Sequence, residues 1–552
     1  MRSLVVFLAL AAPTFAQGPY DLVIRGGRVV DGTGNPWFHG DLAIQGGKIA
    51  AVGHVQGEAR RTIDATGLVV APGFVDIHSH SDLTLFDDGA AQSKLRQGVT
   101  TDVLGEHTSG GPHQGLLKAR TVQVKDQTFT LTRLRDYFDA VEKSGTAINV
   151  ASYVGLGNVW GSVMGTSFDR PTEAQFVAME RVLDEALADG AIGLSTMLAD
   201  PQEMLTTTDD LVRLARVLAK RGAVFSSHIR NEGTEVLDAV REVIAVGERA
   251  GVAVDVIHIK IADQRLWGRM NEIIGLIEAA RARGVDVRAN VYPYTRGNND
   301  LVSIIPPWAH EGGRAALLDR LRDDGQRTRM KKDVLTGLPG WYNHYLAVGG
   351  DWSRMLLSAR LSEKNKRFEG KTMDVVLAQR ETEPGRDALD ALFDFLLEEG
   401  GSIGTIYAHH TEADMELALS RPWCSIGSDG SALAIDGPTR KGHPHPRSFG
   451  TFPRVLGLYV REKGLLGLEE AVRKMTSQNA AKIGLTDRGL LRAGQVADVT
   501  VFDPKTIGDR ATYLDPFQYA EGVRWVVVNG QVALAEGRPT AARGGRALRR
   551  GH

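Results

Sequence analysis

The sequence predicts an α/β protein, with a (β/α)₈ TIM-like barrel and a small β-sandwich domain built from both chain ends. A chain of 552 residues exceeds what one compact core usually supports, so we expect one large domain and a smaller companion. In the middle of the chain, apolar runs alternate with longer amphipathic stretches: 223–225 precedes 233–250, and 254–257 precedes 268–284. Repetition of strand and helix is typical of a parallel sheet with crossover helices.

The two chain ends share a residue pattern that differs from that of the middle of the chain. Residues 20–69 alternate short β-rich pieces with glycine turns, and 497–503 and 523–530 repeat this pattern. Neither end has enough strands for a stable domain alone. We therefore assign residues 17–69 and 486–545 to one β-sandwich domain.

The remaining span, 70–485, is assigned to the barrel. Nine candidate strands fall in it, one more than a (β/α)₈ barrel needs, and the sequence does not settle whether 191–195 or 404–408 is peripheral. Residues 310–375 are rich in charge and short of β-alternation. They are interpreted as an insertion of helices and loop over one face.

The N-terminus has the features of a secretory signal peptide. Arg2 precedes an apolar stretch from Leu4 to Ala12, and small residues precede a predicted cleavage after Ala16. We expect residues 1–16 to be removed and the protein to be secreted or periplasmic. No other segment is long and apolar enough to cross a membrane, and the single cysteine, Cys424, excludes an intrachain disulfide.

Composition favours a small partner. The chain has 65 basic and 67 acidic residues, a formal charge of −2, and no long run of either sign. This balance argues against binding to nucleic acid or to an anionic membrane surface.

A metal site is indicated by the ends of two predicted strands. His78 and His80 are spaced by two at the end of an apolar run, so both side chains point to one side of the strand. A later apolar run ends in Asp429. Histidines and a carboxylate at such positions suit zinc or a similar divalent ion.

More potential ligands lie at the ends of predicted strands, and in a barrel of this kind the active-site residues lie at the carboxyl ends of the strands. The six are His78, His80, Glu106, His228, His258 and Asp429. We expect His78, His80 and Asp429 on one ion, His228 and His258 on a second, and Glu106 as a bridge, with one or two Zn²⁺ per chain. Asp429 is the candidate general acid/base, because it can take a proton from the bound water and return it to a leaving nitrogen.

Several motifs in this order resemble the N-acyl-D-amino-acid deacylase (D-aminoacylase) family of the amidohydrolase superfamily. They are the His-Ser-His strand, Gln-Gly-Val-Thr-Thr at 97–101, Gly-Ala-Ile-Gly-Leu-Ser-Thr at 190–196, Ser-His-Ile-Arg-Asn-Glu at 227–232, His-Ile-Lys at 258–260, Tyr-Pro-Tyr at 292–294, Gly-Ser-Asp-Gly at 427–430 and His-Pro-Arg-Ser-Phe-Gly-Thr-Phe at 445–452. The resemblance covers about residues 20–545. It implies a metal-dependent barrel with a small β-sandwich, and hydrolysis of an amide bond.

The chain departs from the family pattern at two places. Where the family has a cysteine ligand within Gly-Asn-Cys-Gly, this chain has Glu106 followed by His107. Both are candidates for the ligand, and Glu106 is favoured because a carboxylate can bridge two ions. The segment 155–160 also lacks the usual Gly-His-Gly, and both changes bear on substrate identity.

Three residues are candidates for contact with the substrate. In the family, the lysine that matches Lys260 holds the substrate α-carboxylate; a salt bridge at the barrel mouth is the alternative. Tyr292 could hydrogen-bond the carboxylate or the oxyanion, or simply pack in the wall. Arg447 could contact an acidic substrate, or anchor its own loop.

The predicted activity is removal of the acyl group from N-acyl-(D-)amino acids, or cleavage of small dipeptide-like amides, by a hydroxide that the metal holds. Two rivals stay open. One is opening of cyclic amides, as in dihydroorotase- or hydantoinase-like relatives. The other is a metal-stabilised binding protein without catalysis, against which the retained Asp429 argues, since a structural zinc site needs no base beside an open position.

Overall fold

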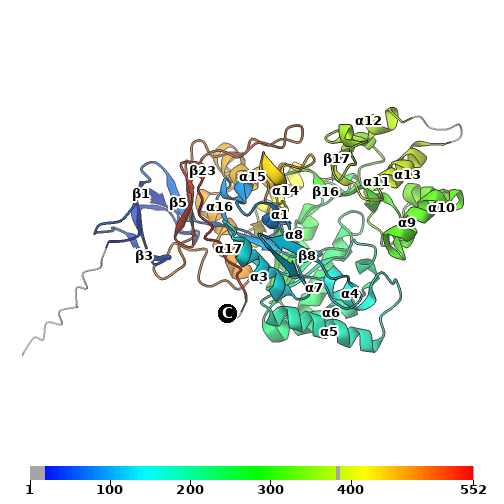
Figure 1. Cartoon of the computed structure of the whole chain (residues 1–552), viewed down its shortest axis with the longest axis horizontal. Helices are drawn as coiled ribbons and strands as arrows, with labels where there is room; N and C mark the ends of the chain where they lie inside the picture. Colours follow the sequence, from blue (N-terminus) through cyan, green and yellow to red (C-terminus); the bar gives the residue numbers. More distant parts are fainter. Residues whose placement is uncertain (1–18, 381–385, 551–552) are drawn as a thin grey trace, which may run out of the picture.

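The computed structural model describes residues 19–380 and 386–550. The predicted signal peptide, residues 1–16, and its cleavage point lie outside the described residues. In Figure 1 the strands of the two chain ends lie together at one end of the molecule, and the segment that carries α9–α13 lies at the other. The α/β character of the prediction is confirmed.

The chain ends join in one sheet of nine strands. Its order is β23-β22-β21-β20-β5-β1-β2-β3, with β4 paired to β1. The contact between the two ends is the antiparallel pair β5–β20, in which Val69 lies opposite Phe502. The strands are β1 (Leu22–Val29), β2 (Phe38–Gln45), β3 (Lys48–Gly53), β4 (Thr62–Asp64), β5 (Val69–Pro72), β20 (Val499–Phe502), β21 (Val523–Val528), β22 (Gln531–Ala535) and β23 (Arg538–Pro539). A second layer that would make this sheet a sandwich stays a prediction.

Nine short parallel strands form the central part. They are β6 (Phe74–Asp76), β7 (Val99–Leu104), β10 (Asn149–Ser152), β11 (Val154–Gly155), β12 (Gly193–Met197), β13 (Val224–His228), β14 (Val254–Val256), β15 (Val287–Val291) and β19 (Cys424–Ile426). They form two sheets, β10-β7-β6 and β11-β12-β13-β14-β15-β19. Only Tyr153 separates β10 from β11, so these two segments count as one interrupted strand.

The first and last parallel strands meet just past their carboxyl ends. The Asp429 amide donates to the His78 carbonyl at 2.8 Å, and the His80 amide donates to the Gly430 carbonyl at 3.0 Å. Eight parallel strands whose ends meet in this way are consistent with the predicted barrel. The contact also brings the predicted ligands of β6 and β19 together.

Helices connect the parallel strands and pack around them. The long connections end in glycines at positive φ, such as Gly222 after α6 and Gly251 after α7, which a left-handed helix end requires. The helices of this part are α1 (Thr84–Asp87), α2 (Gln92–Leu95), α3 (Leu134–Ser144), α4 (Leu156–Met164), α5 (Glu173–Ala188), α6 (Thr208–Arg221), α7 (Val236–Ala250), α8 (Met270–Ala282), α14 (Glu412–Leu419), α15 (Arg447–Arg454), α16 (Leu468–Met475) and α17 (Ser477–Lys482). Their apolar faces and the strands share one large core.

An inserted segment between β15 and α14 has its own core. It contains an antiparallel sheet of order β16-β18-β17, with β16 (Gly297–Asp300), β17 (Met355–Ala359) and β18 (Gly404–Tyr407). Its helices are α9 (Gly313–Arg322), α10 (Asp324–Thr336), α11 (His344–Ala347), α12 (Met373–Ala378) and α13 (Ala388–Glu398). The predicted strand at 404–408 thus belongs to this segment, whereas the one at 191–195 corresponds to β12. The inserted segment runs from 297 to 407, and so begins earlier and ends later than the predicted 310–375.

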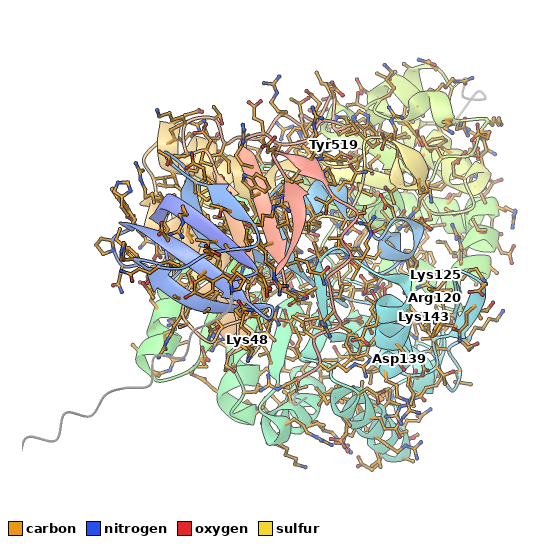
Figure 2. All side chains as sticks on the ribbon, turned by 60° about the vertical axis from the view of Figure 1, so that its left-hand side comes forward. Lys48, Arg120, Lys125, Asp139, Lys143 and Tyr519 are labelled. Carbon is orange, nitrogen blue, oxygen red and sulfur yellow. The ribbon has the colours of Figure 1, made fainter. Side chains whose placement is uncertain are left out.

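A hairpin of β8 (Thr121–Val124) and β9 (Gln127–Thr130) follows β7. Figure 2 shows Arg120 and Lys125 of this hairpin, and Lys48 on the terminal sheet. Within the described ranges, no helix combines the length and the apolar character that a membrane crossing needs.

Candidate metal centre and active site

All six predicted ligands line one cavity at the carboxyl ends of the parallel strands. The cavity has a volume of about 740 Å³, and residues of the inserted segment, among them Asn298, His310 and Tyr342, form part of its wall. The ligands are His78, His80, Glu106, His228, His258 and Asp429. Side chains from separate strand ends thus line the same cavity.

His78, His80 and Asp429 form a first donor group, in which one ligand atom from each lies within 4.8 Å of the others. Asp429 Oδ1 is 2.9 Å from His80 Nε2 and 3.5 Å from His78 Nε2. His78 and Asp429 are buried, and His80 is exposed at the cavity. Two imidazoles and a carboxylate in this arrangement are a donor set that zinc prefers.

A second donor group contains His228, Glu232 and His258. Glu232 Oε1 is 3.6 Å from His228 Nε2 and 3.1 Å from His258 Nδ1. The other ring nitrogen of His258, Nε2, lies 3.9 Å from Asp429 Oδ2. His258 therefore lies between the two groups, with a carboxylate near each of its nitrogens.

Backbone geometry is unusual at two of these ligands. His258 has a φ of 36° and Asp429 a φ of 52°, a region that residues other than glycine seldom adopt. The His258 amide is held by a hydrogen bond to Asn290 Oδ1 at 2.9 Å. Such conformations cost roughly 1–3 kcal/mol each and cluster at functional sites.

Asp429 is charged in this environment. Burial by itself would raise its pKa, but the charge of Arg447 and a hydrogen bond with His80 help to hold the pKa well below the ordinary value of an aspartate. Arg447 Nη1 lies 2.8 Å from Asp429 Oδ2. A carboxylate that stays ionised can serve as a ligand and can accept a proton.

Glu106, the predicted bridge, lines the cavity but belongs to neither donor group. Its Oε2 accepts a hydrogen bond from Ser195 Oγ, and its Oε1 has no hydrogen-bond partner among the described residues. Burial raises the pKa of Glu106 well above the ordinary value. The alternative ligand His107 points to Glu203, with Nδ1 3.2 Å from Oε1.

The three predicted substrate contacts lie around the two donor groups, Lys260 beside the second and Arg447 beside Asp429 of the first. Lys260 Nζ donates to Glu232 Oε1 at 2.5 Å and to the His258 carbonyl at 3.1 Å. The Tyr292 hydroxyl is buried without a hydrogen-bond partner in the described structure, and the Arg447 guanidinium lies 4.8 Å from the centre of the Tyr292 ring. Arg447 lines the cavity, whereas Lys260 and Tyr292 lie behind its lining.

Sequence reasoning missed the role of Glu232. Its neighbour Arg230 binds Glu242, whereas Glu232 binds Lys260. The one signal in the sequence is the spacing, since Glu232 follows His228 by four residues. Such spacing brings two side chains together on a helix, but the backbone between these residues is a loop. The contact with His258 depends on the neighbouring strand, which sequence spacing does not show.

The residues at the centre fit a divalent ion. His78 Nδ1 is buried and has no hydrogen-bond partner in the described part of the chain. Burial lowers the pKa of His228 to about 3 and that of His78 well below its ordinary value, so both imidazoles are neutral near pH 7. Neutral imidazole is the form that binds a metal.

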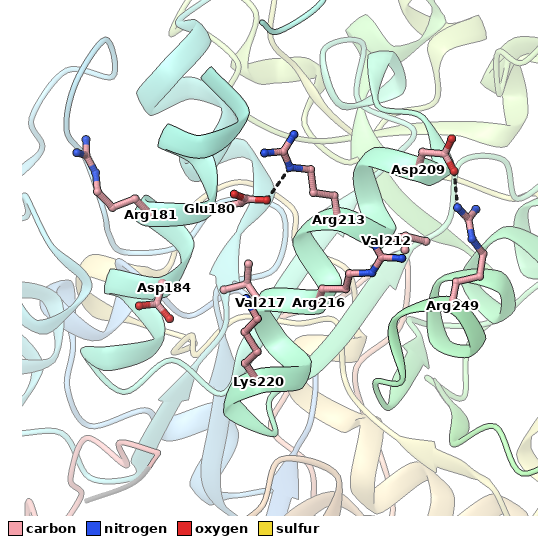
Figure 3. Close-up of a pocket in the computed structure, with 10 residues that line it drawn as sticks. All are labelled: Glu180, Arg181, Asp184, Asp209, Val212, Arg213, Arg216, Val217, Lys220 and Arg249. Atoms are coloured by element: carbon pink, nitrogen blue, oxygen red, sulfur yellow. Dashed lines mark hydrogen bonds and ion pairs between the residues drawn. The ribbon is translucent and has the colours of Figure 1, made fainter. Parts of the chain in front are cut away.

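A second hollow lies outside this centre, on helices α5, α6 and α7 (Figure 3). It is open to solvent and lined mainly by charged side chains. The ion pairs Glu180–Arg213 and Asp209–Arg249 connect neighbouring helices across it. Exposed pairs of this kind contribute little to stability and form no site here.

Comparisons with known proteins identify the family of this chain. The amidohydrolase family model Amidohydro_3 matches residues 61–272 and 416–534. N-acyl-D-glutamate deacylase from Alcaligenes xylosoxydans xylosoxydans is 37% identical over 538 residues, which cover 97% of each chain. D-aminoacylase from the same organism is 34% identical over 540 residues, covering 96% of this chain and 98% of the relative.

A solved structure of N-acyl-D-glutamate deacylase from Bordetella bronchiseptica, complexed with zinc and a phosphonate mimic of the tetrahedral intermediate, matches with a TM-score of 0.78. The identity is 32%, and the match covers 96% of this chain and all of the other. The family model leaves the inserted segment 297–407 unmatched, whereas the match to the relative N-acyl-D-glutamate deacylase covers 97% of this chain. The chain therefore belongs to the amidohydrolase family, and within it to the N-acyl-D-amino-acid deacylases that its motifs resemble.

Proposed function

We propose that this protein is a zinc-dependent hydrolase that removes the acyl group from N-acyl-D-amino acids. The observation that carries the proposal is the ionised Asp429 carboxylate, which is grouped with His78 and His80, is paired with Arg447, and lies 3.9 Å from His258 of the second donor group. The relatives named N-acyl-D-glutamate deacylase and D-aminoacylase support the substrate class. We also propose that the eight parallel strands close into a (β/α)₈ barrel, whose mouth is this cavity.

The first donor group would hold one zinc ion, and the second group would hold another. When bound, the ion supplies Lewis acidity toward an amide carbonyl and lowers the pKa of a coordinated water. Glu106 would join the ligands through its Oε1, which has no hydrogen-bond partner among the described residues, while its Oε2 accepts a hydrogen bond from Ser195.

Asp429 is proposed to carry the proton. Its ionised oxygen takes a proton from the attacking water, and then gives that proton to the amide nitrogen as the carbon–nitrogen bond breaks. Arg447 keeps Asp429 ionised in the resting state and fixes its Oδ2. The products are a carboxylic acid and a free amine.

Recognition of the substrate carboxylate is assigned to the predicted residues Tyr292, Arg447 and Lys260. The Tyr292 hydroxyl has no hydrogen-bond partner among the described residues, whereas Arg447 Nη1 already forms an ion pair with Asp429 Oδ2. The Lys260 ammonium is already shared between Glu232 and His258. A substrate carboxylate that reached Lys260 would compete with Glu232.

The test is a substrate panel. The zinc-loaded mature protein is incubated with paired N-acetyl-D- and N-acetyl-L-amino acids, dipeptides and cyclic amides, and amine release is followed beside an Asp429→Asn control. We expect release from N-acetyl-D-amino acids that is lost in the control. Ring opening without amine release from linear amides would favour the cyclic-amide alternative. No reaction with any substrate while zinc is bound would contradict catalysis.

A further inference from the structure

Behind the first donor group lies a fully buried polar network centred on Lys94. Lys94 is on α2, and its side chain has no exposure to solvent. Its ammonium lies 2.6 Å from Asp76 Oδ2 and 3.2 Å from Asp102 Oδ1, and both of these aspartates are also fully buried. Burying such charges costs several kcal/mol per ion unless their geometry is well satisfied.

The network reaches the residues on both sides of Asp429. Lys94 Nζ donates to Ser428 Oγ at 3.1 Å and to the Gly430 carbonyl at 3.2 Å. The Ser428 amide donates to Asp76 Oδ1 at 2.7 Å, and the Gly430 amide donates to Ser428 Oγ at 3.0 Å. Hydrogen bonds of its two neighbours, Ser428 and Gly430, therefore hold the backbone on both sides of Asp429, which has an unusual φ.

The same network reaches the backbone between His78 and His80. Ser79 lies between these ligands, and Lys94 Nζ donates to its Oγ at 3.0 Å. Ser79 Oγ in turn lies 2.9 Å from Asp102 Oδ2 and 2.9 Å from the Gly430 carbonyl. One ammonium thus connects the two strand ends that supply the first donor group.

We propose that Lys94 is a positioning residue of the metal centre, which fixes Asp429 relative to His78 and His80. It touches none of the ligand atoms and acts through Ser79, Ser428 and Gly430. This inference rests on the proposed function, because Asp429 matters as ligand and proton carrier only in that reaction. Groups that orient metal ligands typically change metal affinity or activity by about 10–100-fold when removed.

The first experiment compares two buried serines near the carboxyl end of β19. Ser428→Ala removes a hydroxyl of the network, whereas Ser425→Ala removes one whose contact is the Ala289 carbonyl at 3.4 Å. We measure the zinc dissociation constant by competition with a chelator, then kcat, KM and the melting temperature. We expect Ser428→Ala to bind zinc about 10-fold more weakly and to lose kcat with KM little changed, while Ser425→Ala keeps all three values.

The second experiment removes the ammonium. Lys94→Met alone would leave two buried carboxylates facing each other, so it is combined with Asp102→Asn, which keeps the net charge of the network. The matched control is Arg488→Met with Asp498→Asn, a buried pair near the terminal sheet. We expect the Lys94 double variant to lose zinc affinity and kcat by about 10–100-fold, and the control pair to lose melting temperature only.

The outcomes separate the proposals. Zinc affinity and kcat unchanged in folded Ser428→Ala, or reduced equally in Ser425→Ala, would overturn the role of Lys94. If the Lys94 double variant fails to fold, the serine pair still decides. If the unmodified protein releases no amine from any substrate, the proposed function fails, and the zinc affinities alone still test whether Lys94 positions the ligands.

Discussion

At the scale of single residues, His258 joins the two donor groups, because its two ring nitrogens face different carboxylates. Nε2 lies 3.9 Å from Asp429 Oδ2, and Nδ1 lies 3.1 Å from Glu232 Oε1. Lys260 also contacts Nδ1, at 2.8 Å. A carboxylate beside a ring nitrogen fixes the orientation of a histidine ligand, so Glu232, besides being a candidate ligand of the second donor group, would hold the His258 ring in place.

The unpartnered Tyr292 hydroxyl gives a direct test of substrate recognition. We expect Tyr292→Phe to raise KM about 10-fold, equivalent to about 1.4 kcal/mol of lost hydrogen bonding, without loss of zinc. Folding stability should not fall, because no described residue bonds the hydroxyl. Tyr294→Phe is the control, since that hydroxyl is 3.4 Å from Asp509 and away from the donor groups. A KM that rises no more in Tyr292→Phe than in Tyr294→Phe would exclude Tyr292 from substrate recognition.

Lys474 gives a pH-dependent test of stability. Burial lowers the pKa of this lysine from 10.5 to about 8, although its ammonium donates to the Cys424 carbonyl at 2.6 Å. Between about pH 8 and pH 10.5 the unfolded chain holds a proton that the folded protein has lost, so this group makes the protein more stable as pH rises.

The variant Lys474→Met lacks this contribution. The free energy of unfolding of the unmodified protein, minus that of the variant, should therefore grow by up to about 3 kcal/mol across this window. Urea unfolding at several pH values from neutral to alkaline measures the difference. A difference that stays constant would show that folding does not shift the pKa of Lys474, and one that shrinks would show a raised pKa; either would contradict the lowered value.

The candidate ligands that the sequence predicts are those at strand ends with a recognisable pattern. His78 and His80 were predictable because their spacing matches the strand period, and Asp429 because it ends an apolar run. Glu232 and Lys94 were not, because their partners come from distant parts of the chain. Lys94 lies on a four-residue helix and looks like an ordinary surface lysine in the sequence.

At the scale of elements, the sequence predicts where strands lie, but it does not predict to which sheet each strand belongs. The segments at 191–195 and 404–408 have the same apolar character, yet β12 is parallel to β13 and β18 is antiparallel to its neighbours. Pairing direction depends on the connections at each end of a strand. The length of the inserted segment was underestimated for the same reason, because its strands have the same apolar character as the central parallel strands.

Two glycines on neighbouring elements test the helix ends between β13 and β15. Gly251 ends α7 at a φ of 67°, while Gly275 lies inside α8 with an ordinary φ, and a Cβ at either position meets open space. Gly251→Ala should lower the free energy of unfolding by about 1 kcal/mol through backbone strain. Gly275→Ala should raise it by about 0.5–1 kcal/mol through helix propensity. Chemical unfolding of both variants checks the sign, and equal effects would contradict the assigned helix end.

At the scale of the whole molecule, zinc should stabilise the fold, because its ligands come from strands far apart in the sequence. With free zinc at 100 times its dissociation constant, the free energy of unfolding should rise by about 2.7 kcal/mol. Thermal unfolding with and without zinc measures the effect, which should be reduced in His258→Ala and kept in His39→Ala, a histidine on the exposed face of β2. Equal responses in the two variants would place zinc elsewhere.

The central claim is that Asp429 carries the proton in a metal-dependent amide hydrolysis. The most direct measurement strips the protein of metal, restores zinc stepwise, and follows amine release from the best substrate of the panel in the unmodified protein and in Asp429→Asn. The account predicts that activity rises with bound zinc in the unmodified protein, and that the variant stays at least about 100-fold slower at saturating zinc. Turnover at an undiminished rate by zinc-saturated Asp429→Asn would contradict it.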